Sequence, residues 1–392
     1  MIPREKLFNF VYHISVFLIL FLLFWVIFQK KTETDEFRSP ISMDDKKYDS
    51  GLGNVEIVPT EVISPTPINL KSSGKVIEVS PVESIQKAID NAQPGETIKL
   101  LPGVYNQDFV SKRSGTAEKP ITITGSKDVV VKGGGKARVI EINHDHIILS
   151  KFTVDGLHGD SGRVEGYRDK LIYVLGKSAR KGVTGLKILS MNIKNAGGEC
   201  VRLRYFAQNN EIAYNSINRC GIVDFEFKGG GKNGEGIYIG TAPEQLKDGK
   251  NPTSDIDESN NNLIHHNTIN TQGNECVDIK EGSSGNIVEY NNCTGQKDKE
   301  SAGLDSRGSK NIFRYNEVYG NLGAGVRLGG DEDNDGINND VYENTIKNNV
   351  SGGIKFQRAP QGKICGNKME GNKGGDSVGS EAEEFNPTKS CS

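Results

Sequence analysis

Gly325-Val326-Arg327-Leu328-Gly329 and Gly353-Ile354-Lys355-Phe356-Gln357 are two copies of a five-residue pattern that recurs along the chain. Each copy has a small residue, an aliphatic residue, a variable residue, usually a second apolar residue, and another variable residue. Four further copies lie upstream, at Cys200–Arg204, Gly236–Gly240, Cys276–Lys280 and Gly303–Arg307. The six copies start 36, 40, 27, 22 and 28 residues apart. The chain is therefore built from an internal repeat.

A second strand pattern follows most copies, as in Asn286–Asn291 and Asn311–Asn316. Short strands in a repeat of this length, without a helix, are typical of one coil of a parallel β-helix. Alternation within a strand points the aliphatic residues inward and the variable residues outward. Recurrent Asn at the strand ends suits ladders of side-chain amides at the bends. We therefore predict an all-β protein, a right-handed parallel β-helix, with a short capping helix after Ser84.

The composition agrees with a soluble solenoid attached to a single apolar segment. Glycine accounts for 47 of 392 residues, which suits many turns, and the 35% hydrophobic content excludes wholesale disorder. The 48 basic and 51 acidic residues give a net charge of −3, which argues against nucleic acid as a partner.

Residues 8–28 are almost entirely apolar. As a helix they would span about 31 Å, enough to cross a bilayer core of about 30 Å. We predict an N-terminal flank at 1–7, a transmembrane anchor at 8–28, a flexible linker at 29–75 and the β-helix domain at 76–392. All six cysteines follow the span, which suggests an oxidising exterior. We therefore expect a single-pass membrane protein, monomeric, with its β-helix domain extracytoplasmic.

The cysteines occur in three sequential pairs: Cys200 with Cys220, Cys276 with Cys293, and Cys365 with Cys391. Bridges in that order are plausible, and the last could pin the C-terminal tail. Six cysteines allow fifteen connectivities, so the spacing leaves the pairing open.

Equivalent residues of successive coils stack about 4.8 Å apart, so the repeat alignment predicts outward columns of side chains. The third positions form the column Arg202, Tyr238, Asp278, Asp305, Arg327 and Lys355. The fifth positions form the column Arg204, Gly240, Lys280, Arg307, Gly329 and Gln357. The turns before three of the strands supply Glu199, Glu235 and Glu275. Charged residues facing water would be the simplest explanation, but here the signs group by column.

Stacked acids beside stacked bases suggest a site for an acidic polysaccharide. Removing the proton beside a uronate carboxylate places extra charge on that carboxylate, which Ca²⁺ and a guanidinium can stabilise. We expect Glu275, Asp278 and Asp305 to bind Ca²⁺, with Glu235 as a further ligand. Arg307 would neutralise the substrate carboxylate and Lys280 would be the base, its pKa lowered by the neighbouring Arg307. The predicted substrate-binding residues are Arg202, Arg204, Tyr238 and Arg327.

The first coils resemble a known family. Ser84-Ile85-Gln86 through Pro94-Gly95, Pro102–Tyr105, Lys119–Ile123 and His146–Leu149 are similar to the opening coils of chondroitinase B and alginate lyases. Those enzymes belong to the pectin-lyase-like right-handed β-helix superfamily, and the resemblance covers about residues 76–370. It implies a polysaccharide lyase with acidic calcium ligands resembling Glu275 and Asp278, and an arginine resembling Arg307. The family's lysine lies several residues beyond its second acid, where this chain has Gly282-Ser283, whereas Lys280 is only two residues beyond Asp278.

Two other features complete the sequence-based expectations. Asp331, Asp333 and Asp335 begin a loop like a calcium-binding loop, but the twelfth position is Tyr342 rather than Glu, so it is not an EF-hand. Residues 241–262 interrupt the repeat and could either wall a substrate groove or be an ordinary insertion.

The leading hypothesis is a membrane-anchored lyase that cleaves an acidic polysaccharide by calcium-assisted β-elimination. The alternatives are a non-catalytic, glycan-binding or structural β-helix and an inverting glycoside hydrolase that uses Asp278 and Asp305.

Overall fold

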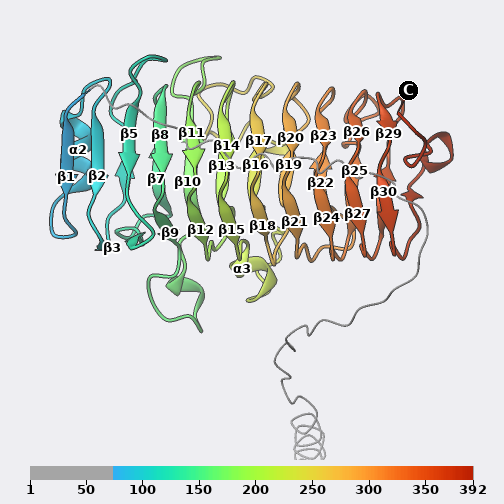
Figure 1. The fold of residues 1–392 in the computed structure, drawn as a ribbon, viewed down its shortest axis with the longest axis horizontal. Helices are drawn as coiled ribbons and strands as arrows, with labels where there is room; N and C mark the ends of the chain where they lie inside the picture. The colour runs from blue at the N-terminus through green and yellow to red at the C-terminus, as the bar shows by residue number, and fades with distance from the viewer. Residues whose placement is uncertain (1–73, 392) are drawn as a thin grey trace, which may run out of the picture. The chain divides into compact units, whose positions relative to one another are not determined.

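A computed structural model describes residues 74–391 of the chain (Figure 1). The predicted transmembrane anchor at 8–28 and nearly all of the predicted linker at 29–75 lie outside these residues. Within residues 74–391, no helix is both long enough and apolar enough to cross a bilayer.

The predicted capping helix is confirmed as α2 (Ile85–Asn91). Ser84 caps it, because its hydroxyl accepts a hydrogen bond from the Lys87 amide at 3.1 Å. Ile85, Ala88 and Ile89 are the buried residues of the helix and belong to the main hydrophobic core. Their spacing at i, i+3 and i+4 places them on one face, which closes the first coil of the solenoid.

The strands form three parallel sheets, in which each strand pairs with its equivalent in the next coil. Sheet A contains β1 (Val76–Val79), β2 (Thr97–Leu100), β5 (Ile121–Thr124), β8 (Ile147–Ser150), β11 (Lys187–Leu189), β14 (Glu211–Ala213), β17 (Leu263–His265), β20 (Ile287–Glu289), β23 (Ile312–Arg314), β26 (Asp340–Tyr342) and β29 (Ile364–Cys365). Sheet B contains β3 (Gly103–Tyr105), β6 (Val129–Val131), β9 (Thr153–Asp155), β12 (Asn192–Lys194), β15 (Ser216–Asn218), β18 (Thr268–Asn270), β21 (Asn292–Thr294), β24 (Glu317–Tyr319), β27 (Thr345–Lys347) and β30 (Lys368–Glu370).

Sheet C contains β4 (Phe109–Val110), β7 (Arg138–Ile142), β10 (Lys170–Leu175), β13 (Val201–Arg204), β16 (Ile237–Ile239), β19 (Val277–Ile279), β22 (Ala302–Ser306), β25 (Ala324–Leu328), β28 (Gly352–Phe356) and β31 (Ser377–Val378). Short helical segments interrupt the loops at η1 (Val164–Gly166), α3 (Ile222–Phe225), η2 (Pro243–Gln245) and η3 (Ala382–Glu384). The predicted parallel β-helix is confirmed.

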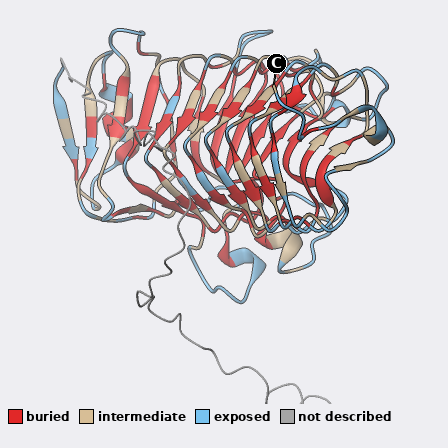
Figure 2. Ribbon diagram, turned by 45° about the vertical axis from the view of Figure 1, so that its right-hand side comes forward, coloured by how far each residue is buried: buried red, intermediate tan, exposed pale blue. Residues whose placement is uncertain are grey.

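The repeated five-residue pattern forms sheet C, and its aliphatic positions line the interior (Figure 2). Val277 and Ile279 of β19 are fully buried, and so are Val326 and Leu328 of β25. Burying one such side chain stabilises the fold by about 1.5–3 kcal/mol. One continuous apolar core therefore runs through the coils.

Asparagine ladders hold the bends together, as the recurrent Asn residues predicted. Asn215 donates a side-chain hydrogen bond to Asn267, which donates to Asn291, each at 2.9 Å. Asn291 then donates to Asn316 and Asn316 to Asn344, each at 3.0 Å. The ladder satisfies amides that are at most 2% exposed, so these buried polar groups stabilise the stack.

The three sequential disulfides are present: Cys200–Cys220, Cys276–Cys293 and Cys365–Cys391. No cysteine among the described residues is free. The Cys276–Cys293 bridge lies beside β19, and the Cys365–Cys391 bridge ties the C-terminal tail to the last coils. The order of pairing that the spacing left open is therefore the simplest one.

Candidate active site on sheet C

Strand register confirms the predicted third-position column. In the parallel pairs of sheet C, Arg202 lies beside Tyr238 and Tyr238 beside Asp278. Asp278 then lies beside Asp305, and Asp305 beside Arg327. Because Ile279 pairs with Ser306, the same register places Lys280 next to Arg307 in the fifth-position column. The repeat alignment thus predicted which residues of different coils are neighbours.

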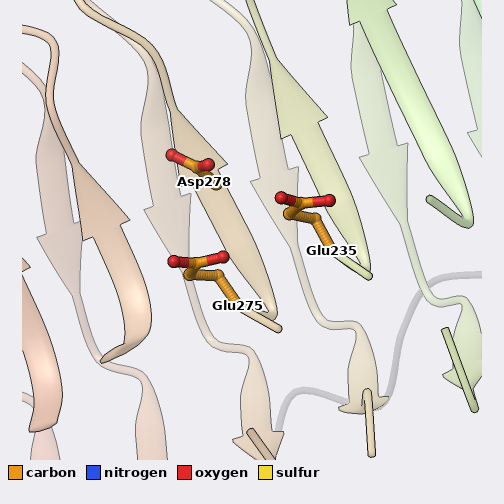
Figure 3. A group of neighbouring side chains, drawn as sticks. All are labelled: Glu235, Glu275 and Asp278. Carbon is orange, nitrogen blue, oxygen red and sulfur yellow. The ribbon is translucent and has the colours of Figure 1, made fainter. Parts of the chain in front are cut away.

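Glu235, Glu275 and Asp278 form an acidic cluster, shown in Figure 3. Glu235 comes from the turn before β16, Glu275 from the turn before β19, and Asp278 from β19 itself. One carboxylate oxygen of each lies within 4.8 Å of the others, and all three residues are buried. One oxygen of Glu275 and one of Asp278 have no hydrogen-bond partner. Two buried carboxylate oxygens therefore lack the hydrogen-bond donor that buried acceptors usually have.

Burial and mutual repulsion shift the titration of this acidic cluster. Burial, together with the charges of Glu199 and Asp278, raises the pKa of Glu235 to about 7. Burial also raises the pKa of Glu275 well above its ordinary value, with Asp278 and Asp305 adding to the shift. Both shifts have the same physical origin, since a buried carboxylate beside other carboxylates resists ionisation.

Lys280 lies against the acidic cluster. Its Nζ is 2.8 Å from Oδ2 of Asp278 and 4.8 Å from the centre of the Tyr238 ring. Burial lowers the pKa of Lys280, and the charge of Arg307 lowers it further, as predicted. The interactions of Lys280 with Asp278 and Tyr238 raise the pKa by more than these two effects lower it. The pKa of Lys280 is consequently raised well above its ordinary value, so the expectation of a lowered pKa is wrong. A lysine with a raised pKa carries its proton at neutral pH.

Asp305 has a different partner from the one predicted. Both of its oxygens accept hydrogen bonds from Arg327, and its side chain is fully buried. The same arginine reaches to 3.7 Å from Glu275. The structure therefore brings Glu275 and Asp278 together with Glu235, whereas Asp305 is held by Arg327, which also pairs with Glu275.

Arg307 lies at the edge of the site with two acidic neighbours. Its guanidinium pairs with Glu281 on one side and with Asp331 on the other. The Glu281 side chain is only 6% exposed, whereas that of Asp331 is 61% exposed. Glu281 was missed at the sequence level because it lies beyond the end of β19, where the strand alternation no longer predicts direction.

Arg202 and Arg204 are both buried beneath other residues. The Arg202 guanidinium stacks at 3.6 Å on the Tyr238 ring and pairs with Glu199 at 2.7 Å. The Arg204 guanidinium pairs with Asp248 at 2.9 Å. Both arginines are 2% exposed, so as folded they are not open to solvent.

The acidic loop after β25 spreads its carboxylates apart. Asp331 pairs with Arg307, Asp333 is fully exposed, and Asp335 accepts a hydrogen bond from the Glu332 amide at 3.0 Å. Within residues 74–391, the acidic cluster of Glu235, Glu275 and Asp278 is the group whose oxygens gather closely enough to hold a metal ion. Calcium binding by this loop stays a prediction.

Comparisons with known proteins show which solved structures have a similar fold. No family model matches the chain, and no curated protein matches it. The solved alginate lyase from Paenibacillus sp. str. FPU-7 is similar, with a TM-score of 0.60 and 20% identity over 77% of this chain and 99% of that one. This chain has the fold of the parallel β-helix polysaccharide lyases.

A second solved structure, pectate lyase Pel9A, is similar with a TM-score of 0.50 and 13% identity over 82% of each chain. The resemblance expected from the opening coils is thus confirmed for the fold. At these identities the site residues must be argued from the geometry of this chain.

Proposed function

We propose that this protein cleaves a uronate-containing polysaccharide by β-elimination. The observation that carries the proposal is the juxtaposition, on one face of sheet C, of the acidic cluster with Lys280 and Arg307. Two proteins of the same fold, as named above, are an alginate lyase and a pectate lyase. Both names describe enzymes that act on polymers of acidic sugars.

The reaction needs three things from the protein. A base removes the C5 proton of the uronate, the electron pair forms a C4–C5 double bond, and the C4–O4 bond breaks. The leaving oxygen takes up a proton, so the reaction balances without water or a redox partner. The negative charge that develops on the C6 carboxylate has to be stabilised while the C5 proton leaves.

Arg307 is suited to bind the C6 carboxylate. Its pair with Glu281 is largely buried and fixes the orientation of the guanidinium, whereas its pair with Asp331 is mostly exposed. Exposed ion pairs contribute little free energy, so a substrate carboxylate can replace Asp331 at small cost. Glu281 thus positions Arg307, and Asp331 occupies the substrate's place on it.

Lys280 is suited to move the proton. Its side chain is 12% exposed, so it reaches the surface of the site, while Asp278 holds its Nζ. In the neutral form its amine would take the C5 proton, and as an ammonium it would return a proton to the leaving oxygen. The raised pKa of Lys280 means that the neutral form is scarce at pH 7.

The acidic cluster is suited to hold a divalent cation. Its buried, closely spaced carboxylates include two oxygens without a donor, and oxygen ligands are what Ca²⁺ prefers. We propose Glu235, Glu275 and Asp278 as the ligands. The ion would supply positive charge beside the carboxylate of the substrate.

A hydrolase using Asp278 and Asp305 has less support. An inverting glycosidase needs one carboxyl group free to donate a proton and another free to activate water. Asp305 is fully buried, and both its oxygens are held by Arg327. The β-elimination proposal does not require Asp305 to be free.

The products of digestion test this proposal. Residues 74–392 incubated with alginate, pectate or chondroitin sulfate should generate the ultraviolet absorbance of an unsaturated uronate, and a chelator should reduce the rate. Reducing ends without this absorbance would indicate a hydrolase. Binding without products would leave a glycan-binding β-helix, and the lyase proposal would fail.

The pH dependence of the rate tests the role of Lys280. If the neutral amine is the base, kcat/KM should rise about tenfold per pH unit from pH 7 upward, because the pKa of Lys280 lies above its ordinary value of about 10.4. Initial rates between pH 6 and pH 10 would measure this, with circular dichroism as the control for folding. A rate that levels off just above pH 7 would instead point to Glu235, whose pKa is about 7.

For its location, we propose a single-pass membrane protein whose β-helix domain is extracytoplasmic and acts as a monomer. The three disulfides support this location, because such bonds persist in oxidising compartments.

A further inference from the structure

The insertion between β16 and β17 supplies the partners that bury Arg202 and Arg204. It begins after Gly240 and ends before Leu263. Gln245 accepts a hydrogen bond from Arg202 at 2.9 Å, and Asp248 accepts one from Arg204 at 2.9 Å. Two arginines on the face of the candidate active site are therefore covered by one loop.

The second half of this insertion is firmly attached to the solenoid. The carboxylate of Asp257, 1% exposed, accepts hydrogen bonds from the amides of Tyr205 at 2.6 Å and Phe206 at 2.8 Å. It also accepts from the hydroxyls of Thr241 at 2.5 Å and Ser259 at 2.8 Å. Four donors on one buried carboxylate fix residues 251–259 in place.

The first half, Pro243–Lys250, is attached quite differently, and we call it the gate segment. Most of its residues are exposed, and its backbone bonds are those of a local turn that begins at Ala242. Beyond that turn, three hydrogen bonds tie the segment to the rest of the described chain. All three are donated by Arg202 or Arg204. Two guanidinium groups therefore hold an otherwise exposed segment closed.

We propose that the gate segment covers a second carboxylate subsite, centred on Arg204, in which Asp248 stands in for a carboxylate of the substrate. This inference rests on the proposed function, and it names a further binding position for a polyuronate. Opening the gate segment would release Arg204 from Asp248 but not from Asn251, which accepts from Nε of Arg204 at 2.5 Å. Arg204 would thus keep its orientation while its NH2 group receives the substrate.

The position of Arg204 fits a linear polyuronate. Arg204 stands in the fifth-position column with Lys280, and Gly240 lies between them without a side chain. Three coils separate Arg204 from Arg307, which amounts to about 14.4 Å along the solenoid. A polymer with one carboxylate on every sugar can therefore present one to Arg307 and another, further along the chain, to Arg204.

Exchange of one carboxylate for another makes opening feasible. The Asp248 side chain is 22% exposed, so its pair with Arg204 is in contact with solvent. A substrate carboxylate that replaces it restores the same charge-assisted hydrogen bond. The buried arginine is then paired with a carboxylate both in the closed state and with substrate bound.

Limited proteolysis of Asp248→Asn tests the gate segment. Chymotrypsin can cut after Leu246, a partly exposed residue of the gate segment that is not adjacent to position 248, and the variant should be cut about fivefold faster there than the wild type. Sodium polygalacturonate or alginate should accelerate cutting of the wild type at the same position. Glu244→Gln is the matched control, since it removes the same charge from the same segment at a residue that contacts neither arginine; its cutting should be unchanged.

Measurements of binding and of kinetics distinguish a failure of the proposed subsite from a failure of the proposed function. Asp248→Asn should lower KM for the polyuronate about fivefold with kcat unchanged, and calorimetry should show a matching decrease in Kd. Unchanged proteolysis and Kd in Asp248→Asn, with an active wild type, would overturn the gate segment alone. If neither protein bound or cleaved any polyuronate, the proposed function would fail and the subsite with it, whatever the proteolysis shows.

Discussion

Arg307→Ala should lower kcat/KM on a polyuronate by about 10³-fold, because the guanidinium stabilises charge that appears only as the C5 proton leaves. The substitution also leaves Glu281, with its 6% exposed side chain, without its arginine. Some loss of stability is therefore expected, and the double variant Arg307→Ala with Glu281→Gln removes the unpaired carboxylate. The ultraviolet assay of unsaturated products, together with the thermal midpoint of both variants, measures the two effects separately.

Arg314→Ala is the matched control for this experiment. Arg314 also pairs with a glutamate of the preceding coil, Glu289 at 2.6 Å, but it lies on sheet A rather than on sheet C. Its loss should reduce stability to a similar degree and leave kcat/KM unchanged. Activity that survives in the folded double variant would show that the substrate carboxylate binds elsewhere.

Glu235→Gln should stabilise the protein above pH 7 by about 3 kcal/mol, because the pKa of Glu235 rises from 4.5 to about 7 on folding. The sign follows from proton binding. Between these two values the folded state holds a proton that the unfolded state has released, so stability falls as the pH rises from about 4.5 to about 7. Glutamine stays neutral at every pH and avoids this loss, while its amide oxygen can still accept from the Gly234 amide.

Chemical denaturation at several pH values measures this effect. The wild type should lose stability between pH 5 and pH 7, and Glu235→Gln should lose less. Added Ca²⁺ should raise the thermal midpoint of the wild type at pH 8 and raise that of the variant less, since the variant has lost one proposed ligand.

Glu211→Gln provides a control of opposite sign. A hydrogen bond from His265 and contacts with Lys187 outweigh partial burial and lower the pKa of Glu211 to about 2. Its substitution should therefore destabilise the protein at neutral pH, and the effect should fade as the pH falls toward 2. A Glu235→Gln variant that is less stable than the wild type at pH 8 would contradict the repulsion inferred for the acidic cluster.

Much of the site could be predicted from the repeat because a solenoid brings equivalent residues of successive coils together. Asp278 and Asp305 are 27 residues apart in the chain, yet they are neighbours by register. Aligning the five-residue copies was enough to find this contact. The same alignment identified Val277 and Ile279 as core residues, since alternation along a strand decides which side faces inward.

The partners of the charged side chains could not be predicted in this way. Asp305 is bound by Arg327 rather than grouped with Glu275 and Asp278, and Lys280 has a raised rather than a lowered pKa. A column specifies which residues are close but not which rotamer each long side chain adopts. The balance between burial, which lowers the pKa of a lysine, and a carboxylate 2.8 Å away depends on those rotamers.

The amino-acid sequence was enough to predict the coils, the direction of each strand side chain and the acidic and basic columns, because these follow from local alternation and from a repeat between neighbouring coils. Two contacts could be seen only in the folded chain: the insertion at 241–262 folds back over Arg202 and Arg204, and Asp305 pairs with Arg327. An insertion has no period to align. Its contacts depend on the full set of distant donors and acceptors that compete for it, and a repeat alignment does not contain that information.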